Sequence, residues 1–449
     1  MGNSFRYLPD TPKDREEMLA TLAVSSLSEL FADIPDHLQL KEPLAIPAAL
    51  HEFALEKKLR KMANKNKDSK EYVFFLGAGT YDHYIPSTVD HVLSRSEFYT
   101  AYTPYQAEAS QGELQALFEF QTMICELTGM DAANSSLYDG FTALGEAATL
   151  AVRSTKRKNI IVSKGVHPQG REVLKTVSVG FNYHVIEVKL AGDTTDLIEL
   201  KKLIDQETAA VIIQYPNFFG SIEDLTKIKA LAELNQALFI VSANPLALAL
   251  LEAPGNLGAD IVVGDTQPLG LSMSYGGPHC GYFAVKKKDI RKIPGRIVGQ
   301  SLDKEGKRGF VLTLQTREQH IKREKATSNM SSNQALNALA SAVFMSALGK
   351  KGLRQMAQLN IDKADYMANS LNEKGFSVNN QAPFFNEFVV ELPFSIQQTN
   401  NVLLEQKIIG GYNLEKEYGL KNHMLVAVTE QRTKEEIDAF IAVLEGMIK

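Results

Sequence analysis

Two stretches of the sequence gather polar and aromatic residues, as either one wall of a binding pocket or a decorated surface does. The first, "FYTAYTPYQAEASQGELQALFEFQTM" at residues 98–123, places hydroxyl and amide side chains directly before a helix-like pattern. The second, "FLGAGTYDHYIPSTV" at 75–89, is a glycine-containing loop with a histidine between tyrosines. The candidates are Tyr81, His83, Tyr84, Tyr102, Thr103, Tyr105, Gln106 and Gln111.

A third candidate segment, "VSKGVHPQGR" at 162–171, places Lys164 and His167 just beyond the end of a strand-like run. Open α/β sheets bind ligands at that edge, but His167 could equally hydrogen bond within its own loop. The Gly77-x-Gly79 spacing lacks the third glycine and the directly following helix of a dinucleotide-binding loop. The run at 264–285 carries five glycines, which fits either a phosphate-binding loop or a tight connection between strands.

The helix after the first polar stretch is indicated by its own pattern. Leu114, Leu117 and Phe118 recur at helical intervals, and Ser110 and Glu113 have the spacing of a capping box. The sequence therefore predicts that the polar residues of 98–111 lie at the entrance of an amphipathic helix.

A doubly wound α/β domain is predicted for the middle of the chain. Runs rich in Val and Ile alternate there with helix-length connections, which is typical of a mostly parallel sheet covered on both faces. The runs lie at 159–164, 184–190, 209–216, 238–244, 259–265 and 280–285.

The two ends of the chain differ from this middle part. Residues 1–70 form short amphipathic pieces separated by prolines, and we expect a helical arm whose apolar stripe, including Leu55, Leu59 and Met62, packs on another subunit. Residues 71–325 are assigned to the large domain. Residues 326–449 are assigned to a small α+β domain, with a long helical stretch near 331–375, strands at 385–392 and 423–430, and a last helix capped by Thr433 and Glu436.

Composition excludes several classes of protein. The chain has 449 residues, 44% of them hydrophobic, and a net charge of -5, which argues against a nucleic-acid or anionic-membrane surface. Cys125 and Cys280 are far apart and have neither disulfide-framework nor metal-ligand spacing, so no metal is expected. The N-terminus lacks the apolar segment of a signal peptide, and a cytoplasmic location is expected.

Several of these segments together resemble one family. The stretches "AYTPYQAEASQG", "GAGTYDHYIP", "GGPHCGYFAV" and above all "RIVGQSLDKEGKRGFVLTLQTREQHIKREKATSN" (296–329) are similar to the glycine decarboxylase P-protein of the glycine cleavage system. The resemblance covers essentially the whole chain, and the length fits the N-terminal, or alpha, subunit of the two-subunit bacterial form. It implies the fold of aspartate-aminotransferase-like enzymes that depend on pyridoxal phosphate (PLP), known as fold type I.

The chain departs from that fold family at two positions that matter for chemistry. PLP enzymes of this fold carry the lysine that binds PLP as a Schiff base shortly after a strand such as "ADIVVGD", but residues 265–285 contain no lysine and Pro268 stands near the expected position. The acid that holds the pyridinium nitrogen is also missing, because Val241 or Ser242 occupies its place in "LFIVSAN". Without the amine and the acid, the chain is not expected to hold PLP covalently.

The resemblance implies that a lysine-bearing beta subunit binds the PLP, in a complex that is expected to be alpha2beta2. Glycine would be decarboxylated there, and the aminomethyl group would pass to the lipoyl arm of the H-protein. We expect the polar aromatic side chains of this chain to face outward and to line the partner's pocket. The residues assigned to that lining are Tyr81, His83, Tyr84, Tyr102, Thr103, Tyr105, Gln106, Gln111 and His167.

Two other functions remain open at this point. The chain could be a self-sufficient PLP decarboxylase or aminotransferase that uses an unusual lysine such as Lys164. It could also be a catalytically silent subunit that only stabilises its partner.

Overall fold

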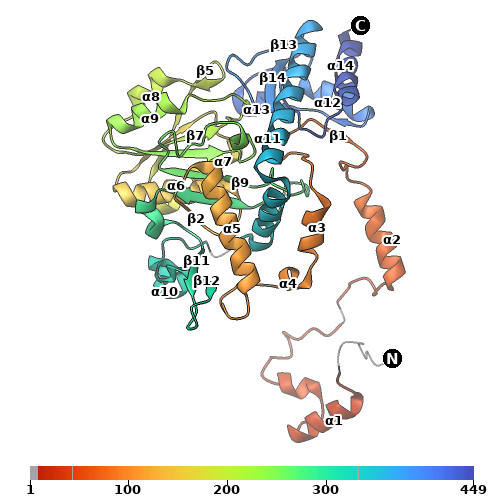
Figure 1. The fold of residues 1–449 in the computed structure, drawn as a ribbon. Helices are drawn as coiled ribbons and strands as arrows, with labels where there is room; N and C mark the ends of the chain where they lie inside the picture. Colours follow the sequence, from red (N-terminus) through yellow and green to blue (C-terminus); the bar gives the residue numbers. More distant parts are fainter. Residues whose placement is uncertain (1–8, 43, 331–332, 449) are drawn as a thin grey trace. The chain divides into compact units, whose positions relative to one another are not determined.

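The computed structural model describes residues 9–42, 44–330 and 333–448, which form two compact units, Met1–Lys67 and Asp68–Lys449 (Figure 1). The first unit contains helix α1 (Pro12–Thr21), the 3-10 helix η1 (Leu27–Phe31) and helix α2 (Glu52–Ala63). Thr11 and Asp14 cap α1 reciprocally. The predicted apolar stripe of α2, at Leu55, Leu59 and Met62, is exposed.

The second unit is built on a seven-stranded sheet with the strand order β2-β10-β9-β8-β7-β3-β4. The five strands from β9 to β4 are parallel, whereas β10 runs antiparallel to both β9 and β2. The strands are β2 (Ala132–Ala133), β3 (Asn159–Ser163), β4 (His184–Val188), β7 (Thr208–Tyr215), β8 (Leu238–Ala243), β9 (Ile261–Asp265) and β10 (Gly281–Val285). Each predicted run forms a strand.

Both faces of this sheet are covered, as the Val- and Ile-rich pattern predicts. Along β7, Ala210 and Ile212 pack against the core with α6 (Gly140–Thr155) and α7 (Pro168–Phe181). Val211 and Ile213 point into the core on the opposite face. That core is completed by α5 (Gln111–Thr128), α8 (Leu197–Leu203), α9 (Leu225–Leu234), η2 (Ala247–Ala249) and the first part of α11 (Ala335–Glu373).

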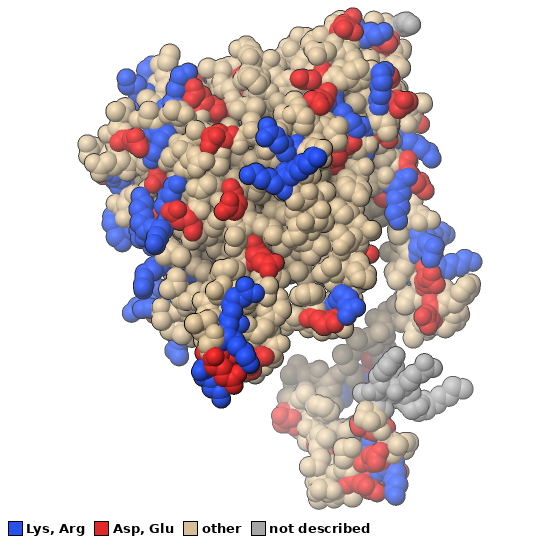
Figure 2. All heavy atoms as spheres, viewed as in Figure 1, with Lys and Arg blue, Asp and Glu red and all other residues tan. Residues whose placement is uncertain are grey.

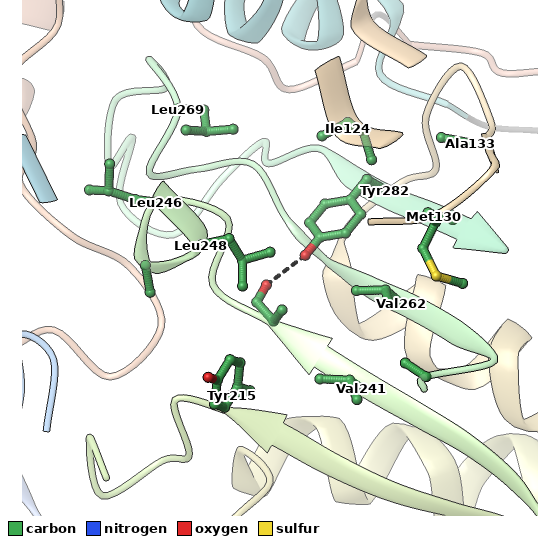
Figure 3. Packing of buried hydrophobic residues seen from close by; sticks show 14 of the residues in the cluster. Ile124, Met130, Ala133, Tyr215, Val241, Leu246, Leu248, Val262, Leu269 and Tyr282 are labelled. Carbon is green, nitrogen blue, oxygen red and sulfur yellow. Dashed lines mark hydrogen bonds between the residues drawn. The ribbon is translucent and has the colours of Figure 1, made fainter. Parts of the chain in front are cut away.

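Figure 3 shows how the carboxyl ends of the central strands are fixed. Tyr215, Val241 and Val262 from three neighbouring strands lie side by side in the core. The hydroxyl of Tyr282 on β10 reaches across β9 and donates a hydrogen bond of 2.8 Å to the carbonyl of Ala243 at the end of β8. The sheet edge above this core is therefore held by a buried bond.

The C-terminal part forms a separate antiparallel sheet with the order β13-β14-β17-β16. Its elements are β13 (Ser377–Val378), β14 (Glu387–Glu391), α12 (Ile396–Glu405), β16 (Tyr412–Asn413), α13 (Glu415–Tyr418), β17 (His423–Ala427) and α14 (Lys434–Ile448). Helix α11 connects the two sheets and changes direction at Gly349, whose φ is 61°. The predicted capping box of α14 is confirmed, since Thr433 and Glu436 exchange both bonds.

One strand lies in an unexpected place. Strand β1 (Val73–Phe74) was expected to begin the large domain, but it pairs in parallel with β15 (Ile408–Ile409) of the C-terminal part. Phe75, next to it, is buried in the C-terminal core. The chain therefore touches the small domain before it enters the large one.

The segment 296–329 contains a hairpin, β11 (Ile297–Leu302) and β12 (Arg308–Thr313), that packs on α5.

The start of helix α5 differs from the prediction, because the Ser110 side chain makes no capping bond. Ser110 has φ -118° and ψ 26°, and its N–H bonds back to Gln106, so a turn already precedes the helix. The remaining short elements are α3 (Ser87–Leu93), α4 (Ser96–Tyr99), β5 (Leu190–Ala191), β6 (Thr194–Thr195), η3 (Lys287–Lys292), η4 (Gln315–Arg317), α10 (Gln319–Lys322) and η5 (Arg323–Lys325).

Surface charge is mixed on the face in view. Figure 2 shows Lys and Arg interspersed with Asp and Glu there, which accords with the small net charge of -5. No helix among the described residues is both long enough and apolar enough to cross a membrane.

Candidate functional site

A cavity of about 90 Å³ lies at the carboxyl ends of the central parallel strands. The loop at Gly79, the start of α6 and the segment before β14 close it. Ligands of open α/β sheets bind at this edge. It is lined by Tyr81, His167, Gln214, Ser242, Asp265, Pro268, Asn386 and Glu387, among others.

Among the residues that the structure describes, no lysine or arginine lines this cavity. Pro268 and Ser242 line it, at the two places where the sequence departs from PLP enzymes, while Val241 points away into the hydrophobic core. Lys164, the alternative amine, does not line the cavity, and its backbone bonds to Val188 and Tyr418.

The N-terminus of α6, which opens on the same cavity, is already capped by carboxylates. Asp139 accepts a bond of 2.6 Å from the N–H of Thr142, and Asp265 accepts one of 3.0 Å from the N–H of Gly140. Asp265 also accepts from the N–H of Gln267 at 2.8 Å. A helix N-terminus favours phosphate because it offers free N–H groups and a positive potential. Here the carboxylates of Asp139 and Asp265 already accept from the N–H groups, and their negative charge opposes the positive potential. A phosphate-bearing cofactor does not fit this lining.

Glu387 is the most deeply buried acid of the cavity. Its carboxylate accepts from the N–H of Ala78 at 2.7 Å and from the hydroxyl of Tyr81 at 2.8 Å. Burial raises the pKa of Glu387 to about 7, because the carboxylate loses water that two hydrogen bonds replace only in part. Burial and the facing Glu387 raise the pKa of Tyr81 well above its ordinary value.

His167 is held as a neutral ring. Its Nδ1 accepts from the N–H of Gln169 at 3.1 Å, so Nε2 carries the proton and donates to the carbonyl of Ala78 at 3.0 Å. Phe141 and Phe218 pack against the ring, each with its centroid 4.8 Å away. Burial lowers the pKa of His167 to about 4, which keeps the side chain uncharged at neutral pH.

His83 is also buried, although the sequence suggested that its loop faces outward. Its Nδ1 lies 2.8 Å from Glu430, which also accepts from the N–H of Tyr84 and from Asn360. Burial raises the pKa of Glu430, but His83 and these hydrogen bonds outweigh it and leave the pKa lowered. Tyr81 is 9% exposed, so the expectation of outward-facing side chains is wrong for Tyr81 and His83.

The stretch at 98–111 behaves differently. The side chain of Tyr102 is 92% exposed and that of Tyr105 is 54% exposed. The guanidinium of Arg296 donates to the Tyr105 hydroxyl at 3.1 Å and lies 5.5 Å from the centre of its ring. The quoted 296–329 segment therefore positions this tyrosine at the surface.

The remaining candidates of the two polar stretches divide into exposed and structural positions. Gln106 and Tyr84 are exposed, and Thr103 is half-buried. Gln111 instead joins α5 to β12, because its amide both donates to and accepts from the backbone of Phe310 at 2.8 Å. The structure thus places Tyr81 and His167 at the cavity, and Tyr102 and Tyr105 at the surface.

Sequence reasoning missed Asp265, Asn386, Glu387 and Glu430 as polar groups of these sites. Asp265 carried a signal, since it ends a strand at the ligand-binding edge. Glu387 and Glu430 carried none, because their partners Tyr81 and His83 lie more than 300 positions away in the sequence. Asn386 carried none either, because the cavity that it lines is formed by segments remote from it in the sequence. Among the described residues, no group of three or more His, Cys, Asp or Glu could hold a metal ion.

Comparisons with known proteins agree with one another. The family model described as "Glycine cleavage system P-protein" matches residues 5–444. A "Probable glycine dehydrogenase (decarboxylating) subunit 1" from Geobacillus sp. (strain WCH70) is 59% identical over 437 residues, which is 97% of this chain and 98% of that protein. The protein of the same name from Bacillus cereus (strain B4264) is 58% identical over the same coverage.

Solved structures give the same result for the fold. A glycine decarboxylase (P-protein) of the glycine cleavage system, in inhibitor-bound form, is 42% identical with a TM-score of 0.92 and covers 98% of this chain and 100% of its own. A sphingosine-1-phosphate lyase of Burkholderia pseudomallei, 15% identical with a TM-score of 0.67, covers 92% of this chain and 94% of its own and shares the fold alone. The predicted α/β architecture of PLP-dependent fold type I is confirmed.

Proposed function

The chain belongs to the glycine cleavage system P-protein family, and from that premise we propose that it is the subunit of a two-subunit glycine decarboxylase that does not carry the cofactor. A second, lysine-bearing subunit holds the PLP in a cytoplasmic alpha2beta2 complex. When bound there, PLP supplies the electron sink for loss of carbon dioxide from glycine. The aminomethyl group then passes to the lipoyl arm of the H-protein.

The observation that carries this proposal is a contrast within the chain. Within the described part of the chain, no lysine lines the cavity where a PLP enzyme of this fold does its chemistry, and a serine, Ser242, stands near the position of the acid. Asp139 and Asp265 occupy the helix N-terminus there. In contrast, the side chain of Tyr102 is almost fully exposed, because no other part of the described chain packs over it. The exposure of these polar side chains supports a role in an active site that the second subunit completes.

We assign three roles to the residues of that surface. Tyr102, Tyr105 and Gln106 donate hydrogen bonds to the carboxylate of glycine or to charge that develops on it. Arg296 orients Tyr105 through its bond to the hydroxyl and its stacking on the ring. Gln111 fixes the start of α5 to the hairpin and so acts on structure alone. The covering subunit excludes water, which strengthens each of these bonds.

The test is glycine decarboxylation by the assembled complex with Tyr102→Phe, Tyr105→Phe or Gln106→Ala. Losing one preorganised hydrogen bond to developing charge lowers turnover by about 10²-fold. Assembly and PLP content should not change. Tyr366→Phe serves as the matched control, because it removes a tyrosine hydroxyl that binds Asp438 in the C-terminal part, far in sequence from the surface tyrosines.

Wild-type turnover in all three variants, with an intact complex, would contradict the assigned roles and favour a purely stabilising subunit. Covalent PLP on Lys164 of the isolated chain, detected by borohydride reduction and peptide mapping, would favour the self-sufficient enzyme instead.

A further inference from the structure

A second cavity, of about 560 Å³, lies along the second half of helix α6. The first residue of that helix, Gly140, lines the cavity at the sheet edge, whereas Arg153 lines this one. The helix rises by about 20 Å from Gly140 to Arg153, at about 1.5 Å per residue. The second cavity is therefore a different place from the sheet edge.

Basic side chains from three separate segments converge on this second cavity. Within the described chain they are Arg153 of α6, Arg291 and Lys292 of η3, and Lys325 of η5. Because these segments lie far apart in the sequence, the fold brings the charges together, and no local run of basic residues does so.

Two of these cations are available to a ligand. Arg291 and Lys325 are exposed, and neither forms an ion pair with any residue that the structure describes. Lys292 differs from them, because its ammonium group lies 2.8 Å from the carboxylate of Asp289, which offsets its charge.

Arg153 is held in a fixed orientation at the wall of the cavity. Its Nη1 donates to the backbone carbonyls of Ala326 and Thr327, and its guanidinium lies 5.0 Å from the centre of the Phe181 ring. A guanidinium has five N–H donors, and Nε and Nη2 of Arg153 donate to no group of the described chain. A guanidinium that is already oriented loses little side-chain entropy when it binds an anion.

The acids of the lining do not cancel this positive charge. They are Glu146 and Glu324. Burial raises the pKa of Glu146, which favours its neutral form. Even when both acids are ionised, the three cations other than Lys292 outnumber them.

The lining also contains apolar surface. Leu150, Pro294 and Ala326 are buried, and all three line the cavity. An anion that carries an organic group can cover this surface, whereas a bare inorganic ion leaves it in water. The lining therefore favours an organic ligand with more than one negative charge.

We propose that this second cavity binds a small organic anion that carries at least two negative charges. The anionic groups lie between Arg153, Arg291 and Lys325, and the rest of the ligand covers Leu150 and Pro294. Phosphate esters and di- or tricarboxylates share this chemistry, because guanidinium groups pair with phosphate and carboxylate alike. The site belongs to this chain alone and does not rest on the proposed function.

The experiment is calorimetric titration of the full-length chain, without its second subunit and at constant ionic strength. The probes are fructose 1,6-bisphosphate, citrate and, as a control with one charge, acetate. We expect saturable binding of at least one polyanion and none of acetate, and weaker binding as sodium chloride is added. The polyanion that binds more tightly tells whether the natural ligand is a phosphate ester or a carboxylate.

Variants of the lining test whether binding occurs at this cavity. Arg291→Ala and Lys325→Ala should each weaken binding about tenfold, because a hydrogen bond to a charged group is lost. Arg291→Lys keeps the charge and should weaken it less. Arg354→Ala is the matched control, since Arg354 is an exposed arginine of α11 that forms no ion pair within the described chain. It should bind like the wild type.

Circular dichroism melts establish that each variant is folded before it is titrated. The proposal is overturned if neither polyanion binds saturably, if acetate binds as tightly as they do, or if Arg291→Ala and Lys325→Ala both bind like the wild type. Loss of association with the second subunit in Arg291→Glu, together with no binding of polyanions by the wild-type chain, would show that the cavity is a protein interface instead.

Discussion

The cavity at the sheet edge and the surface at 98–111 use similar polar side chains in opposite ways. In the cavity, Asp265, Glu387 and Tyr81 are bonded to groups of the same chain. At the surface, Tyr102 is exposed, and Tyr105 is half-exposed and is held by Arg296 and by an edge contact with the His320 ring. Polar groups that are satisfied internally stabilise a fold, whereas exposed and oriented ones are available to a partner or a substrate. The comparison teaches that burial, and not residue type, separates the two roles.

The N-terminal arm also exposes side chains that are available to a partner. Its removal should have the largest effect of the changes considered, on association with the second subunit. Leu55, Leu59 and Met62 form an exposed apolar stripe on α2. Deleting residues 1–67 should abolish association with the second subunit, while 68–449 stays folded because it is a compact unit with its own cores. Size-exclusion chromatography of the mixed subunits measures this, and unchanged complex formation would contradict it.

The burial of Glu387 in the cavity should make the free energy of unfolding depend on pH. Burial raises the pKa of Glu387 from 4.5 to about 7, so the folded chain holds a proton that the unfolded chain releases above pH 4.5. This contribution to stability is fully present below about pH 4.5 and is lost as the pH rises through about 7, by about 3 kcal/mol in all.

Urea denaturation of the wild type and of Glu387→Gln at several pH values isolates that contribution. The amide cannot titrate, so the difference in the free energy of unfolding between the two proteins should change across this window. A difference that is independent of pH would show that the Glu387 carboxyl titrates normally.

His83 and Tyr102 sharpen the comparison within the predicted site. His83→Ala removes the buried partner of Glu430 and should lower the free energy of unfolding by about 2 kcal/mol. Tyr102→Ala should change it by less than about 0.5 kcal/mol, because the side chain is exposed. Equal losses in thermal or urea unfolding of the isolated chain would remove the distinction between the two regions.

The smallest expected effect concerns two predicted helix caps. Thr433→Ala should cost about 1 kcal/mol, since it breaks a capping box that is formed. Ser110→Ala should cost less than about 0.5 kcal/mol, because its hydroxyl makes no capping bond. Urea unfolding of both variants measures the two losses of stability. A larger loss for Ser110→Ala than for Thr433→Ala would show that Ser110 caps α5 after all.

Local pattern was sufficient for the six predicted strands of the central sheet, because a run such as β7 is Val- and Ile-rich on both parities and must be covered on both faces. It did not reveal the hairpin β11–β12 or the pairing of β1 with β15. The resemblance to PLP enzymes, and not local pattern, pointed to Pro268 and to Val241 or Ser242, of which Pro268 and Ser242 line the cavity. Neither of them could reveal that Glu387 and Glu430 turn Tyr81 and His83 inward, since those pairs join segments remote in sequence. The predicted cap at Ser110 was wrong, because capping-box spacing carries no information about the turn that precedes the helix.

The measurement that tests the central claim most directly is borohydride reduction of the active two-subunit complex, followed by peptide mapping of both chains. Reduction fixes the cofactor to whichever lysine held it. The account predicts stoichiometric label on a lysine of the second subunit and none on this chain. Stoichiometric label on any lysine of this chain, Lys164 included, would contradict it.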